Sequence, residues 1–256
     1  MNGDPLPNLE DVDGLVVMGG MMSVADGADP LPEEVDLLRR AIDTGVPVLG
    51  ICLGSQLLAR AAGGEVRHSG RSIEWRELVP TEAAEGDPLF GALPKPVPAL
   101  HWNEDVIEPP PDAVELLARA GEGVEAFRVG DAAWGVQFHP DVDGDALNRW
   151  YEDFADYMGD FDVDALKADD RRREPDQERV SRALFGAFAR VVAERRVTDA
   201  GAGGWRASNR PPRRGTSGGR CFVSVAHGVA VPAMDLFWSL VHLHGGPAPV
   251  RRFLPS

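Results

Sequence analysis

Cysteine is scarce in this sequence, with only Cys52 and Cys221 among 256 residues. Two cysteines do not form the disulfide framework that stabilises small secreted proteins. A reducing compartment fits this composition best, so we expect a cytoplasmic protein with free thiols.

Long apolar runs are also absent. The most apolar stretch, residues 229–243, is interrupted by Pro232 and Asp235. A transmembrane helix needs about 18 or more consecutive apolar residues. The first residues lack the basic region and apolar core of a signal peptide. We therefore expect no membrane as a partner.

Basic residues are outnumbered by acidic ones, 26 to 41, which gives a formal net charge of −15. Such a charge argues against nucleic acids and anionic membranes as general partners. Hydrophobic residues make up 43% of the chain, enough to form a substantial core. The composition is that of an ordinary acidic globular protein.

What the sequence does contain is an alternation of short apolar runs and amphipathic segments. Residues 15–18 and 46–51 are apolar runs of the kind that form buried parallel strands. Residues 33–44 and 53–62 have helical periodicity, and Gly45 is in position to end the first of these helices. The order strand, helix, strand, helix predicts an α/β fold with a parallel sheet.

The middle of the chain is divided less clearly. We expect shorter strands and turns over residues 65–134, a strand over 133–138 and a helix over 144–158. Residues 160–178 are heavily charged and are expected to form a solvated connector or a loose helix. An amphipathic helix should follow over residues 179–195.

The composition changes from about residue 198 onward. Residues 201–256 contain nine Gly, six Pro and seven Arg, with no convincing periodicity. We therefore predict one domain over residues 1–197 and a Gly/Pro/Arg-rich tail over 198–256 that is largely disordered.

The most specific motif is GICLGSQ at residues 50–56, in which a strand ends, a cysteine occupies the corner and a helix begins. This corner places the sulfur of Cys52 near a helix N-terminus, where the helix dipole favours a thiolate. Small residues beside the cysteine permit the tight turn of a nucleophile elbow. A buried structural cysteine is the alternative interpretation.

A second motif, GVQFHPD at residues 135–141, ends another predicted strand at His139. A histidine there can lean over the edge of the sheet toward Cys52, and Asp141 can hold the imidazole in the required tautomer. The alternative is a solvent-facing turn, since His-Pro-Asp is typical of turns.

The third motif is the pair Gly19-Gly20 after the first predicted strand. Two glycines let the backbone approach a ligand closely, and their amides can point at a developing oxyanion. A plain glycine turn is the alternative.

Together, the three motifs resemble the class I glutamine amidotransferases, and in particular a stand-alone group similar to the amidotransferase domain of GMP synthetase. The resemblance runs from about Pro5 to Val197. It implies a flavodoxin-like three-layer sandwich with a mostly parallel sheet. Further matching stretches lie at residues 13–20, 86–90, 101–102 and 125–128.

The resemblance also implies a reaction. Cys52 would attack the side-chain amide of glutamine, with His139 as its general base and Asp141 in the place of the family's acid. Ammonia would leave, and water would hydrolyse the γ-glutamyl thioester, with no metal and no cofactor. The backbone amides of Gly20 and Leu53 would form the oxyanion hole.

The substrate and partner follow from the same resemblance. Gln56 matches the glutamine that helps to shape the substrate pocket. Ammonia would pass to a separate synthetase chain, because no synthetase domain is fused here. A stand-alone γ-glutamyl peptidase is an alternative that uses the same chemistry.

Three departures from the family pattern stand out. Asp141 replaces the usual Glu and is one methylene shorter, which predicts a longer hydrogen bond to His139 or a shifted loop, and reduced activity. Met21 follows the two glycines where Pro is usual. The strand, helix and second strand with which members usually begin are missing before Leu6, and their absence would leave a strand edge exposed. A non-catalytic truncated remnant or binding protein is therefore a further alternative.

Other histidines are not expected to take part in chemistry. His101 belongs to a region that the resemblance places on a surface near the glutamine site, and the adjacent Trp102 is expected to pack. His227, His242 and His244 have no cysteine or acid at ligand spacing, so no metal site is expected.

Overall fold

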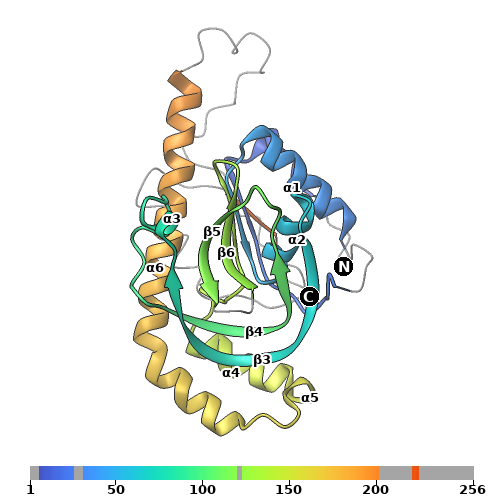
Figure 1. The fold of residues 1–256 in the computed structure, drawn as a ribbon, viewed down its shortest axis with the longest axis vertical. Helices are drawn as coiled ribbons and strands as arrows, with labels where there is room; N and C mark the ends of the chain where they lie inside the picture. Colours follow the sequence, from blue (N-terminus) through green and yellow to red (C-terminus); the bar gives the residue numbers. More distant parts are fainter. Residues whose placement is uncertain (1–5, 26–30, 120–122, 202–220, 225–256) are drawn as a thin grey trace.

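The structure is a computed structural model in which one eight-stranded sheet is flanked by helices (Figure 1). It describes residues 6–25, 31–119, 123–201 and 221–224. The strands are β1 (Gly14–Val17), β2 (Val48–Ile51), β3 (Glu65–Pro80), β4 (Val97–Glu108), β5 (Val114–Arg119), β6 (Gly123–Val129), β7 (Ala133–Val136) and β8 (Cys221–Ser224). The helices are α1 (Pro32–Thr44), α2 (Leu53–Ala61), α3 (Glu82–Glu85), α4 (Gly144–Asp153), α5 (Ala155–Met158) and α6 (Val163–Gly201), with a 3-10 turn at Leu9–Asp11.

Half of the sheet is parallel. Strands β8, β1, β2 and β7 are neighbours in that order, with Leu15 opposite Val48 in the β1–β2 pair. All residues of β1, β2 and β7 are buried, which explains why they read as unbroken apolar runs. The strands predicted near residues 15–18, 46–51 and 133–138 are confirmed. The first is shifted by one residue, and the other two are each two residues shorter than expected.

The other half of the sheet is antiparallel. Strand β6 pairs antiparallel with β7 and thereby joins the two halves. Strands β4, β3, β5 and β6 pair antiparallel in that order, and β6 pairs with β4 again, so these four strands form a closed ring. The prediction of a mostly parallel sheet is therefore wrong, although the α/β class holds. The short strands expected over residues 65–134 are found only in the second part of that range, as β5 with 6 residues and β6 with 7, whereas β3 is 16 residues long and β4 is 12.

The long β3 strand escaped prediction because most of it faces solvent. Its side chains are largely exposed or half-buried, so it has no apolar run to detect. A register shift between His68 and Ser72, with Gly70 at a φ of 91°, bends the strand within the β3–β4 pair.

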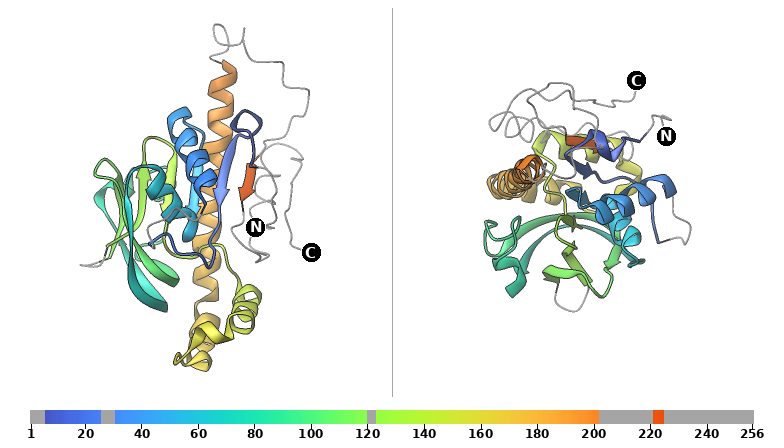
Figure 2. Two further views of the ribbon diagram at one scale, coloured as in Figure 1. Left: turned by 90° about the vertical axis from the view of Figure 1, so that its right-hand side faces the viewer. Right: turned by 90° about the horizontal axis from the view of Figure 1, so that it is seen from above.

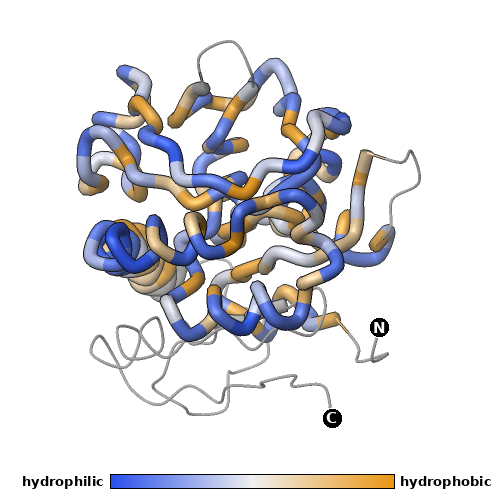
Figure 3. The backbone as a smooth tube through the Cα atoms, turned by 90° about the horizontal axis from the view of Figure 1, so that it is seen from below, coloured by the Kyte–Doolittle hydropathy of each residue, from blue (hydrophilic) through white to orange (hydrophobic). Residues whose placement is uncertain are grey.

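Helices cover both faces of the sheet. The core on one face joins Leu15 of β1 to Val35 and Leu38 of α1, and includes α2. The core on the opposite face joins Val16 of β1 to Phe185 of α6. Figure 2 shows this layering from two further directions. Hydrophobic and hydrophilic residues are interspersed along the backbone, as two-sided packing requires (Figure 3).

Helix α6 decides between the two alternatives expected over residues 160–178, a solvated connector and a loose helix. From Val163 onward this segment is helical and continuous with the helix predicted over 179–195, and the combined helix accommodates Pro175. Asp170 and Gln177 are buried although their neighbours in sequence are charged. The charged residues conceal this inner face, because ion pairs such as Arg179–Asp176 keep the outer face polar. The helix predicted over 144–158 is divided into α4 and α5.

Strand β8 occupies the edge of β1 that was expected to be exposed. Its residues pair in parallel with β1, from Gly14 opposite Cys221 to Val17 opposite Ser224. This strand belongs to the tail predicted to be largely disordered, and α6 itself continues to Gly201. The remaining tail residues, 202–220 and 225–256, lie outside the described residues.

None of the helices in the described part of the chain is both long and apolar enough to cross a membrane.

Candidate active site

Cys52 occupies a tight corner between β2 and α2. Its φ of 50° and ψ of −109° lie in a region that side-chain-bearing residues seldom adopt. A Cβ at Gly50 would lie 2.5 Å from the carbonyl oxygen of Gly54, and a Cβ at Gly54 would lie 2.0 Å from that of Val17. The two glycines that flank Cys52 in the motif are thus required by the close approach of the backbone.

His139 and Asp141 are brought to this corner by the end of β7. The backbone N–H of His139 donates to the carbonyl of Leu100 at 2.9 Å. Its Nδ1 lies 3.1 Å from Oδ1 of Asp141, and the imidazole lies close enough to Cys52 for that side chain to raise its pKa. All three side chains are buried, so the alternative of a solvent-facing turn is wrong.

The charge state of His139 follows from these neighbours. Burial lowers the pKa of the imidazole, but the negative charges of Cys52 and Asp141 and their hydrogen bonds outweigh it. The net effect raises the pKa of His139 to about 10. At neutral pH the site therefore favours an imidazolium beside Cys52, and a neighbouring cation of this kind activates a cysteine.

The predicted oxyanion segments lie on either side of the cysteine. A Cβ at Gly19 would be 2.9 Å from Cε1 of His139 and 3.4 Å from Cβ of Cys52, so this position has no room for a side chain. Gly20 follows in the same loop. Leu53 is the first residue of α2, where backbone N–H groups have no partner within the helix.

The predicted pocket residue Gln56 is connected to the cysteine through another glutamine. Nε2 of Gln56 donates to Oε1 of Gln137 at 3.4 Å, and Nε2 of Gln137 donates to Sγ of Cys52 at 3.7 Å. Both glutamines are buried. Sequence reasoning missed Gln137, although it lies within the second motif, because the strand pattern did not show which side of the sheet it faces.

An aromatic wall completes the site. Trp102 packs against Trp150 and Tyr151 of α4, with ring centroids 5.4 and 5.3 Å apart. Trp150 also packs edge-on against His139 at 5.0 Å. Trp102 thus packs as expected, and its carbonyl additionally faces Sγ of Cys52 at 3.9 Å. The contribution of α4 had no signal in the sequence.

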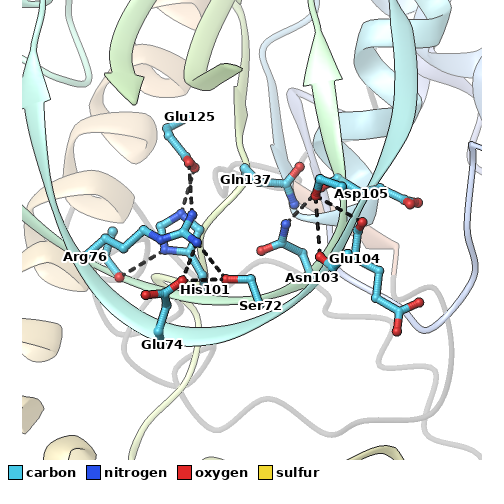
Figure 4. Close-up of polar contacts among 12 residues, drawn as sticks. Ser72, Glu74, Arg76, His101, Asn103, Glu104, Asp105, Glu125 and Gln137 are labelled. Carbon is cyan, nitrogen blue, oxygen red and sulfur yellow. Dashed lines mark hydrogen bonds and ion pairs between the residues drawn. The ribbon is translucent and has the colours of Figure 1, made fainter. Parts of the chain in front are cut away.

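His101 is fully buried, which corrects its expected place on a surface. Its Nε2 lies 2.7 Å from Oε2 of Glu125, and Nη1 of Arg76 lies 3.6 Å from the other oxygen of that carboxylate (Figure 4). The surface expectation failed because His101 points into the closed antiparallel half. In this cluster the ion pair between Arg76 and Glu125 and the contact between His101 and Glu125 join β3, β4 and β6.

Among the residues that the structure describes, no group of three or more His, Cys, Asp or Glu side chains is arranged so that it could hold a metal ion. His227, His242 and His244 lie outside those residues.

Curated sequences similar to this chain include two GMP synthases (glutamine-hydrolyzing). That of Mycobacterium tuberculosis is 39% identical over 150 residues, which is 55% of this chain and 27% of that protein. That of Thermus thermophilus is 38% identical over 130 residues, covering 50% and 24% respectively. The chain thus spans about a quarter of the length of these relatives.

Solved structures with a similar fold include two glutamine amidotransferases. The one from Thermotoga maritima has a TM-score of 0.65 and 27% identity, covering 73% of this chain and 82% of that one. The one from Methylobacillus flagellatus has a TM-score of 0.64 and 28% identity, covering 73% and 80%.

The family model described as "Glutamine amidotransferase class-I" matches residues 2–155, more than half of the chain and the whole stretch that carries the cysteine corner and His139. The chain therefore belongs to the class I glutamine amidotransferase family.

Proposed function

We propose that this protein hydrolyses the side-chain amide of glutamine, releasing ammonia through a thioester on Cys52. One observation supports this above the others: a cysteine at a strained strand–helix corner lies beside a buried histidine whose pKa it raises, and a buried carboxylate hydrogen-bonds that histidine. A nucleophile, a base and an orienting acid in this order are what acyl transfer requires.

The first step is attack by the thiolate of Cys52 on the amide carbon of glutamine. The carbonyl oxygen becomes an oxyanion, for which the N–H groups of Gly20 and Leu53 are the proposed donors. His139, which carries a proton at neutral pH, then gives it to the departing nitrogen, and ammonia leaves. The product of this step is a γ-glutamyl thioester on the sulfur.

The second step is hydrolysis of that thioester. His139 has lost its proton and now accepts one from water, which attacks the thioester carbon. Glutamate leaves, and the thiolate–imidazolium pair is restored. Asp141 orients His139 throughout, with its Oδ1 3.1 Å from Nδ1 of the imidazole.

The fate of the ammonia is also part of the proposal. The relatives that match this chain are named as GMP synthases, and the chain corresponds to about a quarter of their length. We propose that a separate synthetase chain accepts the ammonia. The free thiol that the reaction needs agrees with a cytoplasmic location.

The test is release of glutamate from glutamine, measured beside release from γ-glutamyl peptides. The wild-type chain should turn over glutamine, and Cys52→Ala should lose at least about 10³-fold in kcat. Asp141→Ala should lose about 10-fold to 100-fold, because the base is then poorly oriented. Cys221→Ser is the matched thiol control and should behave as wild type.

Three outcomes would change the proposal. Faster turnover of γ-glutamyl peptides than of glutamine would favour a peptidase. Wild-type turnover in Asp141→Ala would remove this acid from the mechanism. A folded wild-type chain with no turnover of either substrate would favour a non-catalytic protein.

A further inference from the structure

The loop between β7 and α4 carries both His139 and Asp141, and it is buried from residue 137 to residue 142. Buried backbone groups need hydrogen-bond partners, and Pro140 has no N–H to offer. The start of the loop is anchored by the bond from His139 N–H to Leu100. The middle of the loop must be held by something else.

Gln177 of α6 supplies that hold. Its Nε2 donates to the carbonyl oxygen of His139 at 2.7 Å and to that of Val142 at 3.0 Å. A side-chain amide has two N–H donors, and here one nitrogen serves both carbonyls. The two carbonyls lie on either side of Asp141 in sequence, so the Gln177 side chain holds the backbone both before and after Asp141.

We propose that Gln177 is a positioning residue, which fixes the loop by bridging the carbonyls of His139 and Val142 and thereby keeps the carboxylate of Asp141 against Nδ1 of His139. The role deepens the proposed function and rests on it. Gln177 touches neither the sulfur nor the substrate, and it acts through the loop alone.

The margin for error in this contact is small. The distance from Nδ1 of His139 to Oδ1 of Asp141 is 3.1 Å, near the upper end of the range for N–H···O hydrogen bonds. A loop displacement of about 1 Å would therefore break the bond. Gln177 is itself buried, so its bonds to the two carbonyls do not compete with bulk water.

Replacing the amide by an apolar side chain of similar length tests the proposal. In Gln177→Met, kcat for glutamine should fall about 10-fold, with KM little changed. The negative charge of Asp141 and its hydrogen bond raise the pKa of His139, so their loosening should lower it. NMR should therefore show the His139 ring titrating at lower pH than in the wild type.

Two further variants separate positioning from packing. Ser181 lies one turn further along α6 and is also buried, and its Oγ has no hydrogen-bond partner in the described part of the chain. Ser181→Ala should leave both kcat and the His139 titration unchanged. Gln177→Asn keeps the donors but is too short to reach both carbonyls, so its losses should lie between wild type and Gln177→Met.

Two results would overturn the inference. One is a Gln177→Met protein with the wild-type kcat and His139 titration. The other is a loss of activity that only follows the folded fraction in a thermal melt, with the His139 titration unchanged. The NMR titration does not need substrate, so it tests Gln177 even if the wild-type chain proves inactive with glutamine, an outcome that would count against the proposed function alone.

Discussion

In the parallel half of the sheet, β2 is four residues long and ends at a cysteine with positive φ. In the antiparallel half, β3 and β4 are three to four times as long, and the ring of strands to which they belong encloses a buried contact between His101 and Glu125. The reactive corner therefore follows a short parallel strand, and the long antiparallel strands lie beside it.

The two halves of the sheet shape the site in different ways, one through close backbone approaches and the other through side-chain packing. On the parallel side, Gly50, Gly54 and Gly19 permit close backbone approaches around Cys52. On the antiparallel side, the carbonyl of Trp102 and the ring packing of Trp102 on Trp150 limit the space around the sulfur. His139 follows β7, the strand at which the two halves meet.

The largest effect is expected from a methyl group added at the corner that holds Cys52. Gly54→Ala would place a Cβ 2.0 Å from the carbonyl oxygen of Val17, closer than any real contact. Because both partners belong to packed backbone, we expect a loss of about 3 kcal/mol or more in the free energy of unfolding, measured by urea denaturation, together with loss of turnover.

The matched control for that substitution is Gly86→Ala. Gly86 has a φ of −95°, and a Cβ there would meet no atom within 4 Å. Its free energy of unfolding should stay the same or rise by about 0.5 kcal/mol. Equal losses in the free energy of unfolding at Gly54 and Gly86 would mean that the backbone of Gly54 does not approach the carbonyl of Val17 as closely as described.

A smaller effect is expected from the contact between His101 and Glu125 in the antiparallel half. His101→Phe leaves Arg76, at 3.6 Å, as the polar side chain that the described part of the chain offers to the buried carboxylate of Glu125, so the free energy of unfolding should fall by about 2 kcal/mol. Turnover per folded molecule should stay close to wild type, because His101 stabilises the antiparallel strands and not the turn that holds Cys52. A loss of turnover comparable to that of Cys52→Ala would contradict this division of roles.

The smallest effect is expected at the edge of the parallel half. The N–H groups of a strand alternate in direction, so one of Phe222→Pro and Val223→Pro should remove a hydrogen bond from β8 to β1. We expect that variant to lose about 1 kcal/mol in a urea melt and the other to lose less. If neither proline has an effect, the pairing of β8 does not stabilise the domain.

The corner around Cys52 was predictable because all of its signals are local. An apolar run, a cysteine, a glycine and a helical pattern follow one another within residues 46–62. Gly45 likewise ends α1 with a φ of 70°, as its position predicted. A helix or strand can be predicted from sequence when its buried side chains recur at the regular spacing of that element.

The antiparallel half and the supports of His139 were not predictable in the same way. The pairing of β4 with both β3 and β6 depends on contacts between distant segments, which no local pattern encodes. Gln177 lies in a charged run whose inner face shows no apolar stripe, and its partner His139 is 38 residues away. Asp141 was visible in the motif, but the means by which a short acid is held in reach was not.

The central claim is that Cys52 reacts as a nucleophile with the side-chain amide of glutamine. Its most direct test is labelling with an electrophilic glutamine analogue, such as a diazoketone, followed by peptide mass mapping. We predict one adduct, on Cys52, that forms more slowly in His139→Gln and is suppressed by excess glutamine. An adduct confined to Cys221, or labelling of Cys52 that glutamine does not slow, would contradict the account.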